Sequence, residues 1–180
     1  MNKRIAYIFR GAPASGKGTL TKEFMKRLPG KIAYLELDAL RWGFHLINRD
    51  IHEIEDEEHQ LSYQNFLSLL ENYCRNGKYT IVVEGLFSWD VPSPHGNMQD
   101  ILSLLDHYQY EAKLLYLQAD YDTLWERNTK RDYQVPKEEF DSLHNHVTQK
   151  IGDSEIIIDV QNNTIEECLE ILEKHIESSF

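Results

Sequence analysis

Short apolar runs alternate along the chain with longer segments in which apolar residues recur every three or four positions. The apolar runs have the length and the β-branched or aromatic content of buried strands, and they occupy residues 5–9, 32–37, 79–83, 112–117 and 155–159. The periodic segments are typical of helices, and they occupy residues 17–28, 57–75, 98–108, 121–131, a segment that begins at 136, and 164–176. Helices between successive strands predict an α/β fold, a five-stranded parallel sheet with helices on both faces.

Length and composition agree with a single domain over residues 1–180. Hydrophobic residues make up 41% of the chain and charged residues 27%, which is ordinary for a globular domain with a full core. No apolar run approaches the length of a membrane span, and the N-terminus lacks the pattern of a signal peptide, so we expect a cytoplasmic protein with no membrane partner. The net charge of −11 disfavours binding to long nucleic acid but permits a basic pocket for one nucleotide. The oligomeric state stays open.

The two cysteines, Cys74 and Cys168, lie far apart in the sequence, each within an apolar helical pattern. Because buried free cysteines behave as small apolar side chains, we expect two reduced, buried thiols rather than a disulfide or a metal site.

The segment Arg10 to Thr19 joins the first predicted strand to the first predicted helix. Gly11 and Gly16 let the backbone turn so that successive N–H groups converge on one anion, and the positive end of a helix beginning near Lys17 adds to that field. Lys17 would reach the outer phosphates, and the Thr19 hydroxyl can bind phosphate or metal. We therefore expect a nucleotide to be bound by Gly11, Ala14, Ser15, Gly16, Lys17, Gly18 and Thr19.

One position departs from the usual phosphate-loop pattern, which has Ser or Thr directly after the lysine. This chain has Gly18 there and Thr19 one place later. The resulting Gly-x-Pro-x-Ser-Gly-Lys-Gly-Thr resembles the loop of adenylate kinase and its relatives among the small P-loop kinases. That resemblance disfavours a switch GTPase and leaves the direct metal ligand open.

Asp38 follows the second predicted strand, and Arg41 comes three residues later. Ligands of open α/β sheets bind beyond the carboxyl ends of the strands, so both side chains are placed for chemistry. A carboxylate here can accept the proton of an acceptor hydroxyl as it attacks a γ-phosphate, and Arg41 can hold an anionic or hydroxyl-rich acceptor. In the alternative interpretation, Asp38 caps a short helix and Arg41 is its surface partner.

Glu84 follows the third predicted strand, beside the strand that precedes the loop. Related folds keep an acidic residue there that steadies the magnesium ion, often through water. Glu84 is therefore assigned to metal or acceptor contact, with Thr19 as the second candidate metal ligand. The alternative is a strand-terminal charge. In the loop over residues 86–96, the aromatic side chains either wall a substrate pocket or pack the loop itself.

The segment over about residues 127–137 is interpreted as a lid. Three cations, Arg127, Lys130 and Arg131, come at spacings of three and four, which would put them on one face of a helix that breaks before Pro136. Such a lid closes positive charge over a triphosphate. The alternative is that the cations stabilise the helix dipole alone.

The loop and the alternation of elements resemble the nucleoside-monophosphate-kinase branch of P-loop proteins, over nearly the whole chain. The run ERNTKR at 126–131, followed by Val135-Pro136, is similar to the lid of polynucleotide kinase. This similarity implies that Arg127 contacts the nucleotide and Arg131 the transferring phosphate. Asp38 matches by position the general base of that enzyme, of gluconate kinase and of chloramphenicol phosphotransferase.

Adenylate kinase is the competing resemblance, through its Asp-x-x-Arg at Asp38 to Arg41. Its third strand continues as Asp-Gly-Phe-Pro-Arg, whereas this chain continues as EGLFS from Glu84, so the arginine that grips an acceptor phosphate is missing. We therefore expect an enzyme that uses ATP and Mg²⁺ to phosphorylate a small hydroxyl-bearing molecule. Its expected catalytic residues are Lys17, Asp38, Arg127 and Arg131, and its expected acceptor-binding residues are Asp38, Arg41 and Glu84. The alternatives are a nucleotide kinase and a nucleotide-binding regulatory module that transfers no phosphate.

Overall fold

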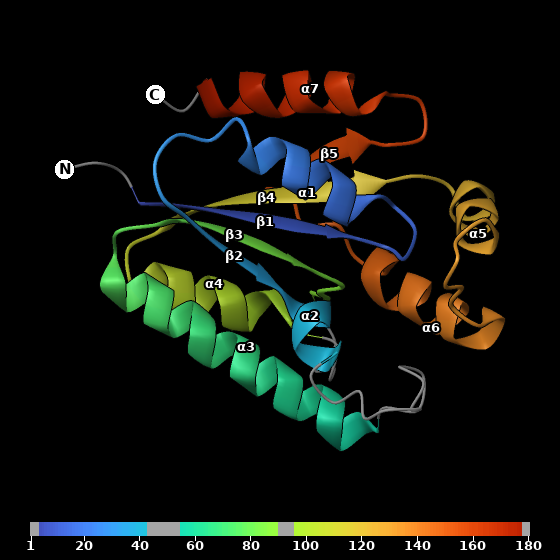
Figure 1. The fold of residues 1–180 in the computed structure, drawn as a ribbon, viewed down its shortest axis with the longest axis horizontal. Coiled ribbons are helices and arrows are strands. Elements are labelled where there is room, and N and C mark those ends of the chain that lie inside the picture. The colour runs from blue at the N-terminus through green and yellow to red at the C-terminus, as the bar shows by residue number, and fades with distance from the viewer. Residues whose placement is uncertain (1–3, 43–54, 90–95, 178–180) are drawn as a thin grey trace.

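The computed structural model describes residues 4–42, 55–89 and 96–177, and these contain one five-stranded sheet (Figure 1). The strands are β1 (Ile5–Gly11), β2 (Ile32–Glu36), β3 (Thr80–Gly85), β4 (Glu111–Gln118) and β5 (Ile156–Asp159). They are all parallel, in the order β2-β3-β1-β4-β5. The helices are α1 (Lys17–Met25), α2 (Leu37–Arg41), α3 (Asp56–Asn76), α4 (Met98–His107), α5 (Tyr121–Thr129), α6 (Lys137–Thr148) and α7 (Ile165–Glu177). The α/β fold expected from the sequence is confirmed.

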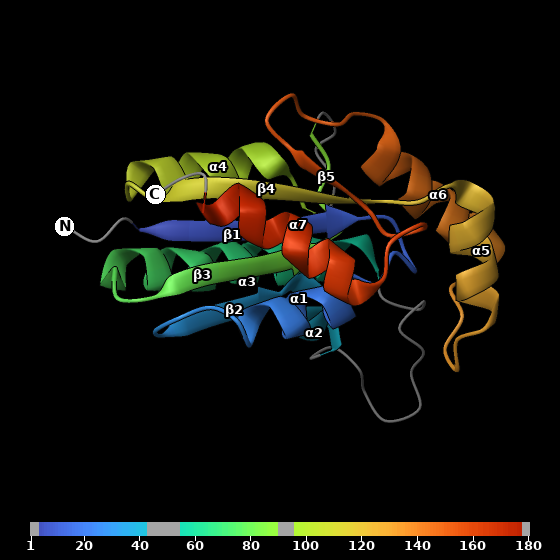
Figure 2. The same cartoon turned by 90° about the horizontal axis from the view of Figure 1, so that it is seen from above.

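Helices cover both faces of the sheet, with α1 and α7 on one side and α3 and α4 on the other (Figure 1). Alternate residues of β1 serve the two layers: Ala6 and Ile8 are buried with α3 and α4, whereas Tyr7 and Phe9 are buried with α1 and α7. Burial on both faces explains why the strands read as continuous apolar runs. Figure 2 shows α5 and α6 beyond the carboxyl ends of the strands, so they border the edge at which the phosphate loop lies.

The carboxyl ends of β2 and β3 bring acidic residues together. In the parallel register Glu36 pairs with Glu84. The second strand ends one residue earlier than expected, because Leu37 already begins α2. Asp38 thus lies in the first turn of α2, whose N-cap is Glu36, and the interpretation of Asp38 as a helix cap is wrong.

Arg10 forms a buried polar cluster that the sequence did not predict. Its side chain is fully buried and donates from Nη2 to Glu155 Oε2 at 2.9 Å, and its Nε donates to the other oxygen of the same carboxylate. Further donors reach the carbonyl oxygens of Val147 at 2.8 Å and Lys150 at 2.7 Å. This residue, near the end of β1 and directly before the phosphate loop, is therefore tied to the end of α6 and to the segment before β5.

The aromatic residues of the loop after β3 pack into the protein. Phe87 is fully buried in the layer of α3 and α4, with its ring centroid 5.6 Å from that of Phe66. The Trp89 indole nitrogen donates to Glu155 Oε2 at 2.9 Å. These two rings therefore pack the loop against the protein and, within the part of the chain that the structure describes, do not line a substrate pocket.

Candidate active site

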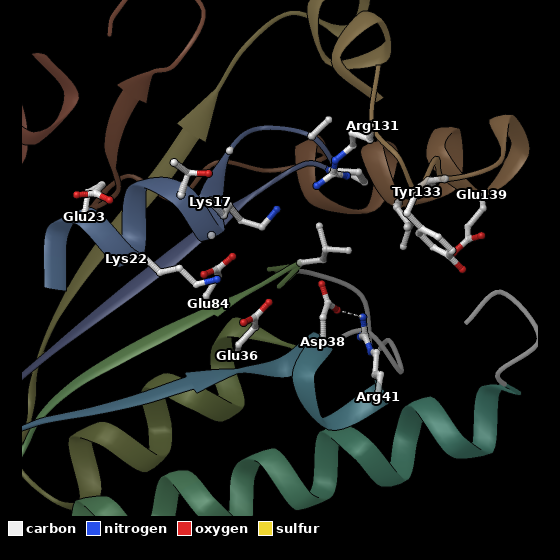
Figure 3. A pocket seen from close by; sticks show the side chains of 18 residues that line it. Lys17, Lys22, Glu23, Glu36, Asp38, Arg41, Glu84, Arg131, Tyr133 and Glu139 are labelled. Atoms are coloured by element: carbon white, nitrogen blue, oxygen red, sulfur yellow. Dashed lines mark hydrogen bonds and ion pairs between the residues drawn. The ribbon is translucent and has the colours of Figure 1, made fainter. Parts of the chain in front are cut away.

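The loop from Gly11 to Gly16 leads from β1 into α1 and forms one wall of the site (Figure 3). Gly16 has φ +82°, a left-handed conformation that glycine adopts without strain. Gly11 is required for a different reason: a Cβ there would lie 2.9 Å from the carbonyl oxygen of Leu117 and 2.9 Å from Ser15 Oγ. The expectation that both glycines supply a turn holds for Gly16, whereas Gly11 allows a close approach of β4.

Lys17 is the first residue of α1 and lies inside the loop. Its Nζ donates to the carbonyl oxygens of Gly11 and Ala12, each at 3.0 Å. Burial lowers the pKa of Lys17, and the charges of Glu84 and Asp38 oppose that shift. A buried ammonium with carboxylates nearby is well placed to exchange its carbonyl partners for the oxygens of an anion.

A first cleft of about 470 Å³ opens beside the loop (Figure 3). Of the residues expected from the sequence, it brings together Ala14, Gly16, Lys17, Gly18, Thr19, Asp38, Arg41, Glu84 and Arg131. They come from the phosphate loop and α1, from α2, from the end of β3 and from the segment after α5, which are far apart in the sequence.

A second cleft of about 340 Å³ lies on the other side of the loop, between α1, α5 and the start of α7. It is lined by Ser15, Arg127, Val160, Asn163 and Cys168 among others, and it shares Ala14, Gly16 and Thr19 with the first cleft. Because the loop forms part of both walls, one elongated ligand can occupy both clefts with its anionic part over the loop. Gly11 is not among the described residues that line either cleft.

The three lid cations do not share one face, contrary to the expectation from their spacing. Arg127 borders the second cleft and donates to the carbonyl oxygen of Val160 at 2.7 Å. Arg131 lines the first cleft, and Lys130 is exposed and paired with Glu126. The helical spacing rule fails because α5 ends at Thr129, so that Arg131 lies on the non-helical segment that follows.

Asp38 and Arg41 form an ion pair on the wall of the first cleft, with 2.6 Å between Asp38 Oδ1 and Arg41 Nη1 (Figure 3). The Arg41 side chain is only 5% exposed, whereas that of Asp38 is 41% exposed. Nε and Nη2 of Arg41 are buried and have no hydrogen-bond acceptor within the described residues, so the guanidinium keeps donors to spare beside the cleft. Arg41 is therefore not the surface partner of the alternative interpretation.

Glu84 lies near the end of β3 and faces the start of α1. The Tyr34 hydroxyl donates to Glu84 Oε2 at 2.8 Å, and Glu36 Oε2 lies 3.1 Å from the same hydroxyl. Burial raises the pKa of Glu84, an effect that Lys17 and the Tyr34 hydrogen bond oppose. Burial, followed by the charge of Glu84, also raises the pKa of Tyr34, so the phenol keeps its proton and acts as a donor.

The Asn128 side chain, near the end of α5, joins the two ends of the segment between α5 and α6. This buried side chain donates to the carbonyl oxygen of Val135 at 2.8 Å and accepts from its N–H at 3.0 Å. Arg131 and Tyr133 lie between these two points and line the first cleft. Tyr133 contacts Trp42 of the segment after α2, with 6.0 Å between ring centroids. Arg131 and Tyr133 thus line the cleft from a segment that the Asn128 side chain ties to α5.

The oxygen donors at the first cleft fit a magnesium ion that arrives with a nucleotide. Magnesium is usually bound by one or two protein oxygens together with phosphates and water. In residues 4–42, 55–89 and 96–177, no group of three or more His, Cys, Asp and Glu side chains is arranged to hold a metal by itself. The Thr19 hydroxyl and the Glu84 carboxylate both line the cleft beside the loop, and they suit an ion whose other ligands are phosphate oxygens.

A family model described as an AAA domain (AAA_33) matches residues 7–149, which include the loop, Asp38 and Glu84. The chain belongs to this AAA-domain family of P-loop proteins. No curated protein matches the chain.

Solved structures share the fold of this AAA-domain protein over nearly their whole length. A sugar kinase from Janibacter sp. is 16% identical, with a TM-score of 0.65 and coverage of 97% of this chain and 95% of that chain. A gluconokinase from Sinorhizobium meliloti is 14% identical, with a TM-score of 0.63 and coverage of 99% and 97%. The tunicamycin resistance protein of Deinococcus radiodurans is 17% identical, with a TM-score of 0.61 and coverage of 97% and 96%. At these identities the likeness shows the fold alone, and that fold is the one found in small P-loop kinases.

No helix in the parts of this AAA-domain protein that the structure describes is long and apolar enough to cross a lipid bilayer.

Sequence reasoning missed three side chains that shape the site: Tyr34, Glu36 and Asn128. Glu36 had a usable signal, because it ends a strand two residues before Asp38. Tyr34 and Asn128 act through contacts with residues on other elements, which local patterns do not reveal.

Proposed function

We propose that the protein is an ATP-dependent phosphotransferase that moves the γ-phosphate to a hydroxyl group of a small molecule. The observation that carries the proposal is the position of Asp38. Its partly exposed carboxylate lines the same cleft as Lys17 and the phosphate loop, on the opposite wall (Figure 3). Phosphoryl transfer to a hydroxyl requires a general base on the opposite side of the cleft from the phosphate-binding loop.

The nucleotide lies along both clefts. Its base and ribose occupy the second cleft beside Arg127, and its phosphates lie over the loop, within reach of Lys17 and the N–H groups at the start of α1. Ser15 Oγ is buried and has no hydrogen-bond partner within the described residues, which is compatible with a hydroxyl that binds the phosphates. Arg131 approaches the transferring group from the lid segment.

The acceptor occupies the remaining part of the first cleft, between α2 and the lid segment. Asp38 accepts the proton of the acceptor hydroxyl, whose oxygen forms the new bond to the γ-phosphorus while the bond to the bridging oxygen of ADP breaks. Arg41, which lines this cleft beside Asp38, binds oxygens of the acceptor. Thr19 and Glu84 would hold a magnesium ion together with the phosphates, and that ion would supply positive charge to the phosphate oxygens.

A nucleotide acceptor is the second candidate, because the Arg41 donors that have no acceptor among the described residues suit an anionic group as well as a hydroxyl-rich one. The absence of a basic residue in the EGLFS segment argues against it. A nucleotide-binding module without transfer is the remaining alternative.

The test is ADP release from MgATP with and without panels of sugars, amino alcohols, nucleosides and nucleoside monophosphates. Release that depends on a non-nucleotide hydroxyl compound supports the proposal. Release that depends on a nucleoside monophosphate favours the nucleotide kinase, and slow release that no acceptor changes favours the module. Lys17→Ala serves as the control, since it should lower ATP affinity and ADP release together.

A further inference from the structure

Tyr34 and Glu84 are neighbours across β2 and β3 near the carboxyl edge of the sheet. In the register of these strands Tyr34 pairs with Val82 and Glu36 pairs with Glu84, so Tyr34 and Glu84 lie on the same face, one step apart along the strands. The Tyr34 side chain extends toward the end of β3, and its hydroxyl donates a hydrogen bond to Glu84 Oε2 at 2.8 Å.

A phenol has a single hydrogen to donate. The contact with Glu84 Oε2, at 2.8 Å, is shorter than that with Glu36 Oε2, at 3.1 Å, so Glu84 is the acceptor. The Glu84 side chain is buried, and a carboxylate oxygen that accepts a hydrogen bond from a fixed tyrosine loses rotational freedom. Tyr34 therefore restrains the orientation of the carboxylate.

The other oxygen of this carboxylate points at the start of α1. A Cβ placed on Gly18 would lie 3.5 Å from Glu84 Oε1, in ordinary contact, and among the described residues outside the adjoining part of α1 no other atom lies within 4 Å of that position. Gly18 is the position at which most phosphate loops carry a hydroxyl residue. In this chain the carboxylate oxygen of Glu84 faces that position instead.

We propose that Tyr34 is a positioning residue for phosphoryl transfer, which holds Glu84 so that its Oε1 faces Gly18 and the phosphate side of the cleft. The inference rests on the proposed function, because it assigns Glu84 to the hydrated magnesium ion of the nucleotide. Tyr34 itself does not line the cleft among the described residues, so it acts through Glu84 and not on the ligands.

The experiment compares Tyr34→Phe with Tyr110→Phe. Tyr110 directly precedes β4, and its hydroxyl donates to the carbonyl oxygen of Tyr79, just before β3 begins, at 3.2 Å. Each variant loses one hydroxyl hydrogen bond and keeps its ring. Calorimetric titration with ATP, in the presence of magnesium and in the presence of EDTA, is combined with the magnesium dependence of kcat and with thermal melting.

Tyr34→Phe should weaken MgATP binding and raise the half-saturating magnesium concentration about 10-fold, the lower end of what loss of such a supporting contact costs. Its affinity for magnesium-free ATP should equal that of the wild type, and Tyr110→Phe should match the wild type in all binding measurements. A purely structural role for Tyr34 would lower the melting temperature and affect both titrations equally, which would overturn the proposal.

The outcomes separate this inference from the proposed function. Unchanged magnesium dependence in Tyr34→Phe, together with acceptor-dependent turnover in the wild type, overturns the role of Tyr34 and leaves the phosphotransferase standing. Weakened MgATP binding in Tyr34→Phe, with no acceptor-dependent turnover in the wild type, supports the role of Tyr34 and overturns the transfer. A wild-type protein that binds no MgATP overturns both.

Discussion

Arg10 donates from Nη2 to Glu155 Oε2 at 2.9 Å, although 145 residues separate them in the sequence. Both side chains are fully buried, and the guanidinium also lies over the ring of Tyr116, 4.7 Å from its centroid. A buried arginine needs several acceptors to offset its loss of hydration, and this one has them. The pair therefore fixes where β1 ends and where the phosphate loop begins, relative to α6 and β5.

Removing one partner of this pair should destabilise the protein strongly. Arg10→Met leaves the Glu155 carboxylate buried without its cation, and we expect the free energy of unfolding to fall by about 3–5 kcal/mol in urea denaturation. The control is Arg27→Met, which breaks ion pairs with Glu166 and Glu173 on the surface and should leave the free energy of unfolding close to that of the wild type. Equal stability losses in the two variants would contradict the importance assigned to the buried pair.

Gly11, which begins the phosphate loop, and Gly18, which lies in the first turn of the helix that follows it, should respond differently to alanine. In Gly11→Ala the new methyl group would meet the backbone of Leu117 at 2.9 Å, which forces β4 or the loop to move and should cost about 1–3 kcal/mol of stability. In Gly18→Ala the nearest atom is Glu84 Oε1 at 3.5 Å, so the stability should change by less than about 0.5 kcal/mol. Thermal or urea unfolding of the two variants provides the comparison, and a stable Gly11→Ala protein would show that the close approach is dispensable.

Arg127 and Arg131 line different clefts, so their replacement by alanine should change different kinetic constants. Arg127→Ala should raise the KM for ATP with a smaller effect on kcat, because the side chain borders the cleft assigned to the base and ribose. Arg131→Ala should lower kcat, by about 10²-fold or more, with a smaller change in KM, because Arg131 lines the cleft to which the proposal assigns the transferring phosphate. Lys130→Ala is the matched control, since Lys130 is exposed and paired with Glu126, and its kinetics should be those of the wild type. Identical kinetic defects in the two arginine variants would argue against the separation of the clefts.

Both cysteines should be unreactive in the folded protein. Cys74 is fully buried, and burial raises the pKa of its thiol to about 11, so that almost no thiolate is present at neutral pH. Cys168 is also buried, and burial raises the pKa of its thiol as well. Titration with a thiol reagent should detect neither thiol in the native state and both in urea. Rapid native labelling of either thiol would contradict the burial of its side chain.

The fold could be predicted from the sequence because each strand is a short apolar run and each long helix shows one buried stripe. The phosphate loop could be predicted because its glycines, its lysine and its flanking elements are adjacent in the chain. The carboxylates near the carboxyl ends of β2 and β3 were found by a topological rule, since strand ends of a parallel sheet meet at one edge. These features depend on local order along the sequence.

The features that sequence reasoning missed depend on tertiary contacts. We interpreted Arg10 as part of the phosphate loop, because its partner Glu155 is 145 residues away in the sequence and the ion pair has no local signal. Tyr34 read as an apolar strand residue, since only the register of β2 and β3 brings its hydroxyl to Glu84. The prediction that the three lid cations share one helix face was wrong, because the spacing of charges does not show that α5 ends at Thr129.

The central claim is most directly tested by Asp38→Asn, which keeps the size of the side chain and a hydrogen-bond acceptor for Arg41 while removing the base. Transfer of labelled γ-phosphate to the acceptor identified by the ADP-release panel is measured together with ATP affinity. The account predicts that the variant binds ATP as tightly as the wild type does, while its rate of transfer falls about 10²–10⁴-fold. Wild-type transfer by the Asp38→Asn protein would contradict it.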